Sequence, residues 1–164
     1  MFMRILKHFA LYEPSKRGTK SEGRLIFPRF HQLRAVEHVV ADVEANGPGG
    51  RYLIWHSAGS GKTKTIAWLS HRLIRHMDTQ SKSTFDSVIV VTDRTVLDEN
   101  IRDDMNLVQS SKGLVVTVGE KSGPKSPQLK KALAEGDHII TCTLQTFPEV
   151  MKLIEDTTEL HGRN

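Results

Sequence analysis

Apolar residues follow a helical rhythm in two parts of the chain. From about Gln32 onward they recur at spacings of three and four, which places them on one face of a helix, and the NGPGG run at 46–50 ends that helix. A second helix is predicted from about Gly61 to His76. The inward residues are Leu33, Val36, Val40 and Val43 in the first helix, and Ile66, Leu69, Leu73 and Met77 in the second.

Short continuous apolar runs predict buried strands of a parallel sheet. They are YLIW at 52–55, SVIVV at 87–91, LVVTV at 114–118 and HIITC at 138–142. Further helices are predicted after a capping-box-like pair at Thr95 and Asp98, over 128–135, and from 147. Strands that alternate with helices imply right-handed crossovers and a sheet covered on both faces. The predicted fold class is therefore α/β.

The first part of the chain is polar and basic. The stretch YEPSKRGTKSEGR at 12–24 is rich in turn formers and is predicted to be a loop or linker. Residues 1–35 carry eight Lys and Arg against two Glu, whereas the whole chain has a net charge of +4. We therefore divide the chain into a basic arm at 1–24 and a folded lobe at 25–164. The charge fits a polyanionic partner or a solvated arm, and the sequence leaves both open.

The composition and the apolar runs bear on the cellular compartment of the protein. No apolar run approaches the roughly 18–20 residues that a membrane span needs. The N-terminus has too short an apolar stretch and no small-residue cleavage site for a signal peptide. The single cysteine, Cys142, cannot form an intrachain disulfide. We expect a cytoplasmic protein with no membrane partner.

The stretch HSAGSGKT at 56–63 has the chemistry of a phosphate-binding loop. Gly59 and Gly61 let backbone N–H groups converge on a phosphate, and the following helix adds the positive end of its dipole. Lys62 can reach the outer phosphates, and the Thr63 hydroxyl can ligate Mg²⁺. His56 stands where the strict pattern has glycine. The predicted nucleotide-binding residues of the loop are Ala58, Gly59, Ser60, Gly61, Lys62 and Thr63.

Four stretches together resemble the motor (R) subunit of type I restriction–modification enzymes. They are HQLRAV, YLIWHSAGSGKTKTIAWLSHRL, FDSVIVVTDRTVLDENI and TLQTF, within residues 25–147. That subunit is a double-stranded DNA translocase of helicase superfamily 2. The resemblance implies a RecA-like P-loop lobe that uses ATP and Mg²⁺, acts on double-stranded DNA, and associates with methylation and specificity subunits.

The resemblance also assigns roles to individual residues. Gln32 would read the adenine, and Thr92, Arg94 and Thr143 would meet the DNA backbone. Each position has a plainer structural interpretation: Gln32 as an exposed helix residue, Arg94 as a solvated side chain, and Thr143 as a strand end. His56 has two interpretations, as a residue that orients the loop and, more plainly, as a hydrogen-bonded histidine at the end of a strand.

Residues for ATP hydrolysis are harder to find. Catalysis needs a strand-end carboxylate to position water and an arginine on the transferring phosphate. Only Asp93, after VIVVT, approaches such a place, and the Asp-Glu-Ala-His box of the resembled family is absent. We therefore expect part of a first lobe, with no catalytic residue, from an ATP-dependent deoxyribonuclease. Two alternatives stay open: a nucleotide- or DNA-binding module without turnover, and a P-loop kinase that uses Asp93.

Overall fold

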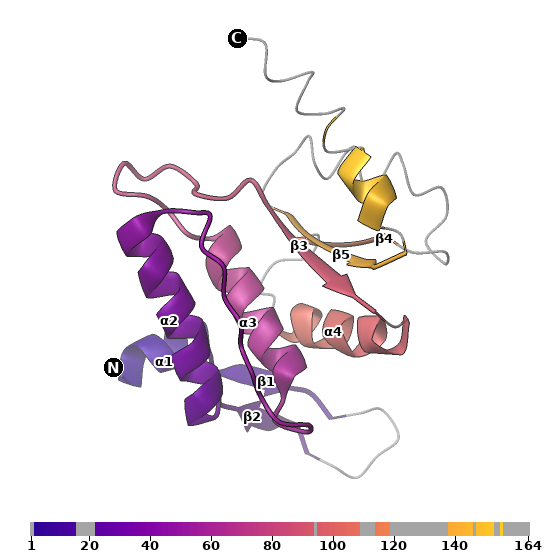
Figure 1. The fold of residues 1–164 in the computed structure, drawn as a ribbon. Coiled ribbons are helices and arrows are strands. Elements are labelled where there is room, and N and C mark those ends of the chain that lie inside the picture. The colour runs from indigo at the N-terminus through magenta and orange to yellow at the C-terminus, as the bar shows by residue number, and fades with distance from the viewer. Residues whose placement is uncertain are drawn as a thin grey trace.

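The computed structural model describes residues 2–15, 22–93, 95–108, 114–118, 138–145, 147–152 and 155. Four named helices and five strands lie in these ranges (Figure 1). The helices are α1 (Phe2–His8), α2 (Phe30–Asn46), α3 (Lys62–Ile74) and α4 (Thr95–Val108). The strands are β1 (Leu11–Glu13), β2 (Arg24–Ile26), β3 (Ser87–Thr92), β4 (Val115–Val118) and β5 (His138–Thr143).

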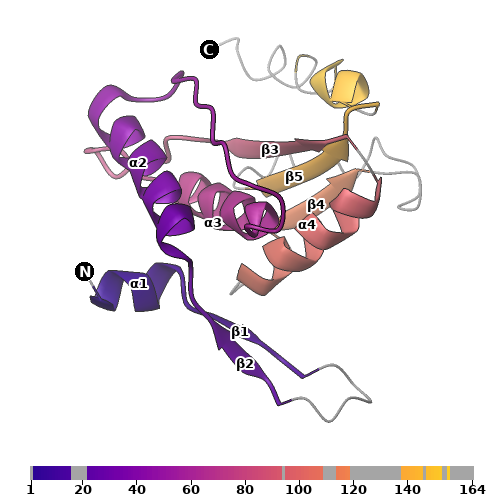
Figure 2. The same cartoon turned by 60° about the horizontal axis from the view of Figure 1, so that its bottom comes forward.

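Three of the predicted strands form one parallel sheet in the order β3-β5-β4. Ile139 and Ile140 follow each other in β5 and face opposite sides, as the two-residue period of a strand requires. Ile139 packs with Met105 of α4, whereas Ile140 packs with Val150 of a helical stretch at 147–152. Figure 2 shows α4 below the sheet and the short helix above it. The predicted parallel α/β sheet with helices on both faces is confirmed.

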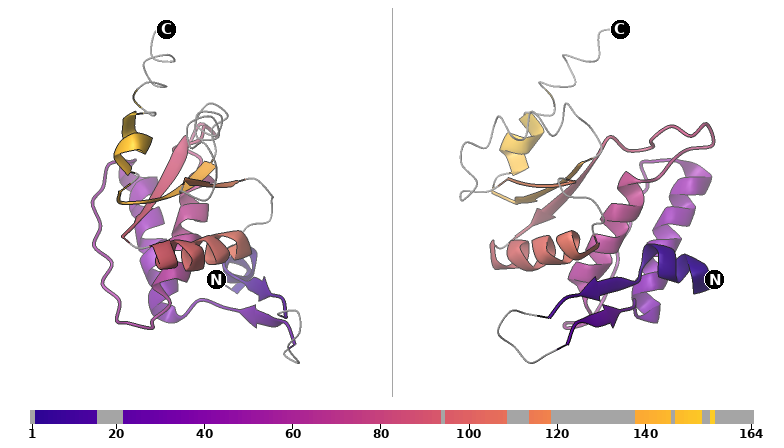
Figure 3. Two further views of the ribbon diagram at one scale, coloured as in Figure 1. Left: turned by 90° about the vertical axis from the view of Figure 1, so that its right-hand side faces the viewer. Right: turned by 180° about the vertical axis from the view of Figure 1, so that it is seen from behind.

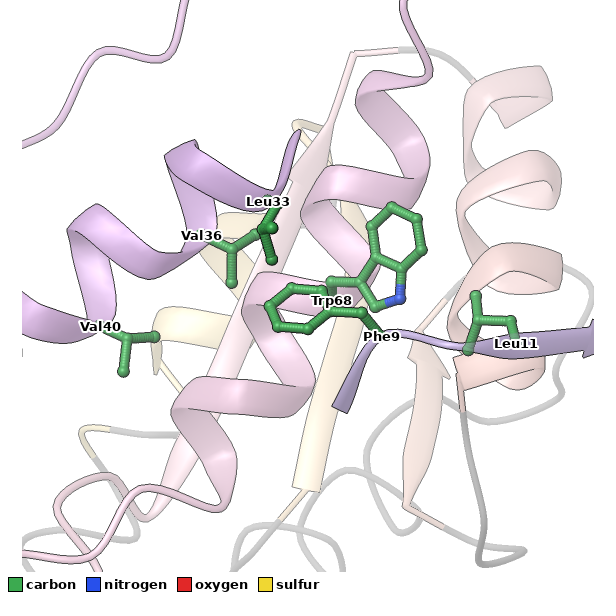
Figure 4. Close-up of a cluster of buried hydrophobic side chains, with 6 residues drawn as sticks. All are labelled: Phe9, Leu11, Leu33, Val36, Val40 and Trp68. Atoms are coloured by element: carbon green, nitrogen blue, oxygen red, sulfur yellow. The ribbon is translucent and has the colours of Figure 1, made fainter. Parts of the chain in front are cut away.

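Helix α3 lies between two hydrophobic clusters. Ala67 and Ile74 pack toward the sheet, together with Ile139. The adjacent Trp68 turns to a second cluster, where its ring lies 6.1 Å from that of Phe9 (Figure 4). The other members of that cluster are Leu11, Leu33, Val36 and Val40. The helix therefore joins the sheet to α2 and to the N-terminal segment.

The N-terminal residues are part of this packing, so the predicted loop at 12–24 is wrong at both of its ends. β1 and β2 form an antiparallel pair in which Leu11 lies opposite Ile26. Phe9 is buried, and α1 precedes it. The signal was hidden because two three-residue strands pair across a polar, turn-rich stretch, and neither is long enough to show alternation by itself.

The predicted buried strand at YLIW is also wrong. Residues 51–57 form no strand, and the side chains of Leu53 and Trp55 are 91% and 90% exposed. The segment runs as an irregular stretch beside α2 and α3, at the left of the view (Figure 3, left). A strand needs a neighbouring edge for its ladder, and residues 51–57 pair with no strand in the described part of the chain. The apolar run at 52–55 favours burial, but it does not determine which strand the segment would pair with.

The remaining helix predictions have mixed outcomes. The predicted helix from about Gln32 is confirmed as α2, the helix from about Gly61 as α3, and the helix after Thr95 as α4. The expected inward position of Met77 is wrong, because α3 ends at Ile74 and Met77 is exposed. The predicted helix over 128–135 lies outside the described residues. None of the helices that the structure describes is long and apolar enough to cross a membrane.

The packing of Phe9 gives a direct test of this arrangement. Phe9→Ala should lower the free energy of unfolding by about 3–5 kcal/mol, because it empties the space beside Trp68. Leu53→Ala should change it by less than about 0.5 kcal/mol, because this side chain is exposed. Urea denaturation measures both values. Equal destabilisation by the two substitutions would contradict the exposed position of residues 51–57.

Candidate functional site

The turn before α3 has the backbone conformation that its glycines allow. Gly59 has φ of 71° and Gly61 has φ of 82°, both in the left-handed region that other residues rarely adopt. Gly61 is the residue that caps α3, so Lys62 is the first residue of the helix. The N–H groups of a first helical turn have no partner within the helix. The loop therefore brings free donors and a lysine to one place.

Gln32 connects α2 to this loop. Its side chain is 3% exposed, so the interpretation of Gln32 as an exposed helix residue is wrong. The amide oxygen accepts from the Arg29 N–H at 2.8 Å, and the amide nitrogen donates to the Gly61 carbonyl at 2.9 Å. A Cβ atom on Gly61 would lie 2.6 Å from that nitrogen. The φ angle favours glycine at 61, and a Cβ atom there would also have to displace the end of the Gln32 side chain.

His31 holds the neighbouring peptide of the same loop. Its Nε2 lies 3.2 Å from the Ser60 carbonyl oxygen, and its ring meets that of His56 edge-on, with 4.7 Å between centroids. His56 was predicted to be a hydrogen-bonded residue at a strand end. It follows no strand, and its Nδ1 is buried without a partner among the described residues. His31 was not among the predicted site residues, although its place beside Gln32 at a helix start was a usable signal.

Lys62 is exposed and lies over its own loop. Its Nζ donates to the carbonyls of Ser57 at 2.9 Å and of His56 at 3.2 Å. Ala58 and Gly59 are exposed, and Thr63 is half-buried. In the described part of the chain the ammonium group is held by these two exposed hydrogen bonds, which water or an anion can replace at little cost. The lysine and the loop fit the requirements of a phosphate group.

Two contacts fix α3 against α4. Lys64, in the first turn of α3, forms a partly buried salt bridge with Asp104 at 2.6 Å. Further along, His71 lies with its Nε2 3.0 Å from the Met105 carbonyl, to which it donates. Burial lowers the pKa of the His71 imidazole, so the ring is neutral near pH 7. The helix that carries the loop therefore has a fixed direction relative to the sheet.

The residues predicted to meet DNA lie elsewhere, at the carboxyl ends of the strands. Thr92 and Thr143 are directly opposite each other in β3 and β5, and their exposed fractions are 7% and 9%. The structure thus brings these two together, largely buried, next to the exposed Asp93. Arg94 lies outside the described residues. A DNA contact of the three remains a prediction.

A glycine-rich turn with a lysine, leading into a helix packed on a parallel sheet, defines a P-loop-type α/β module. The family model for the SWI2/SNF2 ATPase matches residues 31–162, and the chain belongs to this family. No curated protein and no solved structure matches the chain. The protein is therefore a helicase-like, nucleotide-binding ATPase module, with the RecA-like fold class that the sequence predicts.

The close approach of Gln32 to Gly61 predicts a difference between the two left-handed glycines. Gly61→Ala should destabilise the chain by about 2–3 kcal/mol, because it adds a clash to the strained φ. Gly59→Ala should cost only about 1 kcal/mol, because open space surrounds its Cβ position. The penalty of Gly61→Ala should shrink when Gln32→Ala is also present. Thermal and urea unfolding of the four variants would contradict this geometry if both glycine substitutions cost the same.

Proposed function

We propose that this chain binds Mg-ATP through residues 58–63 and is the ATP-binding part of a type I restriction motor subunit. Such a subunit is an ATP-dependent translocase on double-stranded DNA. One observation carries the nucleotide-binding part of the proposal. Two left-handed glycines present a helix start whose first residue, Lys62, donates from its Nζ to loop carbonyls and to no other group among the described residues.

The phosphates of the nucleotide fit this arrangement. The N–H groups of Gly61 and Lys62 have no acceptor among the described residues, so both can donate to phosphate oxygens. The described residues hold no group of three His, Cys, Asp or Glu side chains that could bind a metal. Mg²⁺ would be held by the Thr63 hydroxyl, phosphate oxygens and water, which matches its preference for oxygen ligands.

Gln32 remains the residue that we propose for adenine. Its two internal hydrogen bonds use one amide hydrogen and one oxygen lone pair. A glutamine amide has two of each, so one donor and one acceptor are left. This is the combination that the edge of adenine needs. The side chain is buried against the loop, so a base would have to approach beside Gly61.

The DNA part of the proposal rests on the sequence motifs. HSAGSGK together with VTDRTVLD is typical of the restriction motor subunits, and the SWI2/SNF2 ATPase match is compatible with a motor on DNA. We propose that Thr92, Arg94 and Thr143 contact the DNA backbone and that methylation and specificity subunits are partners of the complex. The alternative is a nucleotide- or DNA-binding module without turnover.

Substitution of the loop lysine tests nucleotide binding. Lys62→Ala should reduce the affinity for Mg-ATP at least about 100-fold, because it removes the cation that faces the outer phosphates. Lys82→Ala, at another exposed lysine, should have no effect. Calorimetric titration of the three proteins gives the affinities. Equal affinity of the unchanged chain and Lys62→Ala would refute the proposed site.

Turnover by this chain should be negligible, with or without DNA. Hydrolysis needs a water-positioning carboxylate and an arginine that alone is worth roughly 10³–10⁵ in rate. Among the described residues, Asp93 is the one carboxylate that directly follows a strand of the parallel sheet. Phosphate release is measured on the pure chain and on Asp93→Asn. Robust release that disappears in Asp93→Asn would favour a kinase-like P-loop enzyme over the proposed motor.

A further inference from the structure

We infer that His31 is a positioning residue of the phosphate loop. It holds the Ser60 carbonyl so that the Gly61 N–H faces the bound phosphate. This inference rests on the proposed function and adds a residue to it that neither the sequence motifs nor the family match assigns.

The chemistry of the contact defines the state of the imidazole. The His31 Nε2 lies 3.2 Å from the Ser60 carbonyl oxygen, and a carbonyl only accepts, so Nε2 carries the hydrogen and donates. Gln32, the next residue of α2, donates to the next carbonyl of the loop, that of Gly61. Two adjacent side chains at the start of α2 therefore hold two adjacent carbonyls.

Peptide geometry turns these two contacts into a direction for the loop. The described residues contain no cis peptide bond, and in a trans peptide the carbonyl and the following N–H point in opposite directions. With the Ser60 carbonyl turned toward His31, the Gly61 N–H points away from α2. With the Gly61 carbonyl turned toward Gln32, the Lys62 N–H does the same. Both donors thus point away from α2.

The surroundings of His31 indicate that this geometry serves a ligand. The ring of His56 packs edge-on against it at an interplanar angle of 82°, which limits rotation of the imidazole. Beside this contact the Ser60 Oγ and the His56 Nδ1 are buried without partners in the described part of the chain. Unpaired buried polar atoms are unfavourable, so the loop is not arranged to maximise its own hydrogen bonding.

Two substitutions of His31 separate the donor from the ring. His31→Phe keeps an aromatic ring against His56 but removes the N–H. His31→Gln keeps an N–H at a similar reach and removes the ring. We expect His31→Phe to weaken binding of both Mg-ATP and inorganic tripolyphosphate about tenfold. This corresponds to the loss of one charge-assisted hydrogen bond, from the Gly61 N–H to a phosphate oxygen. His31→Gln should stay within about threefold of the unchanged chain, because the donor persists.

Tripolyphosphate has no base. An equal loss of affinity for Mg-ATP and tripolyphosphate in His31→Phe therefore shows that the substitution affects phosphate binding. Loss of ATP binding alone, unchanged affinity in His31→Phe, or equal weakening in His31→Phe and His31→Gln would each overturn the inference. If His31→Phe does not fold, amide NMR of the unchanged chain decides. Tripolyphosphate must shift the Gly61 and Lys62 resonances, and unshifted resonances overturn the inference.

These outcomes are distinguishable from failure of the proposed function. An unchanged chain that binds neither Mg-ATP nor tripolyphosphate overturns both proposals. A chain whose binding is lost in Lys62→Ala and retained in His31→Phe overturns only the role of His31. The unfolding temperature of each variant serves as the control, since a purely structural role of His31 would lower it in parallel with the affinity.

Discussion

The burial of α3 on two sides is the constraint on which the rest of this structure depends. Ala67 and Trp68 are consecutive, and they pack into different clusters, one against the sheet and one against α2 and the N-terminal segment. Because both clusters include side chains of α3, packing on two sides fixes the position of this helix. The salt bridge from Lys64 to Asp104 adds a contact near its first turn. A loop at the end of such a helix has a well-defined location.

The position of the loop is set by α3, but its shape is set by α2. His31 and Gln32 lie in the first turn of α2 and reach across to two successive carbonyls of the loop. Glycine at 61 permits both the backbone angle and the approach of the glutamine amide. Leu33 and Val36 pack α2 against Trp68. This packing therefore contributes to the geometry of the loop, although the loop contacts come from His31 and Gln32. The stability of the fold and the shape of the loop therefore depend on the same contacts.

The polar side chains differ in exposure between the two predicted sites, the loop at 58–63 and the carboxyl ends of β3 and β5. At the loop, the lysine and the free N–H groups are accessible, as recognition of an anion requires. At the strand ends, Thr92 and Thr143 are mostly buried, and the exposed Asp93 follows them. The family match supports an ATPase module, and the loop is where its chemistry is most fully described.

Local patterns in the sequence were sufficient for α2, α3, α4 and the three parallel strands, because each has a period or an apolar run of its own. The glycine turn before α3 was also predictable, since the residue types largely determine its left-handed backbone angles. The N-terminal pairing of Leu11 with Ile26, the exposure of Leu53, and the contact of His31 with Ser60 were not. The two contacts join residues that are 15 and 29 positions apart in the sequence. The exposure of Leu53 depends on how residues 51–57 pack against the rest of the chain. Only packing in three dimensions decides such questions, because an apolar residue carries the tendency to be buried but not the identity of its neighbour.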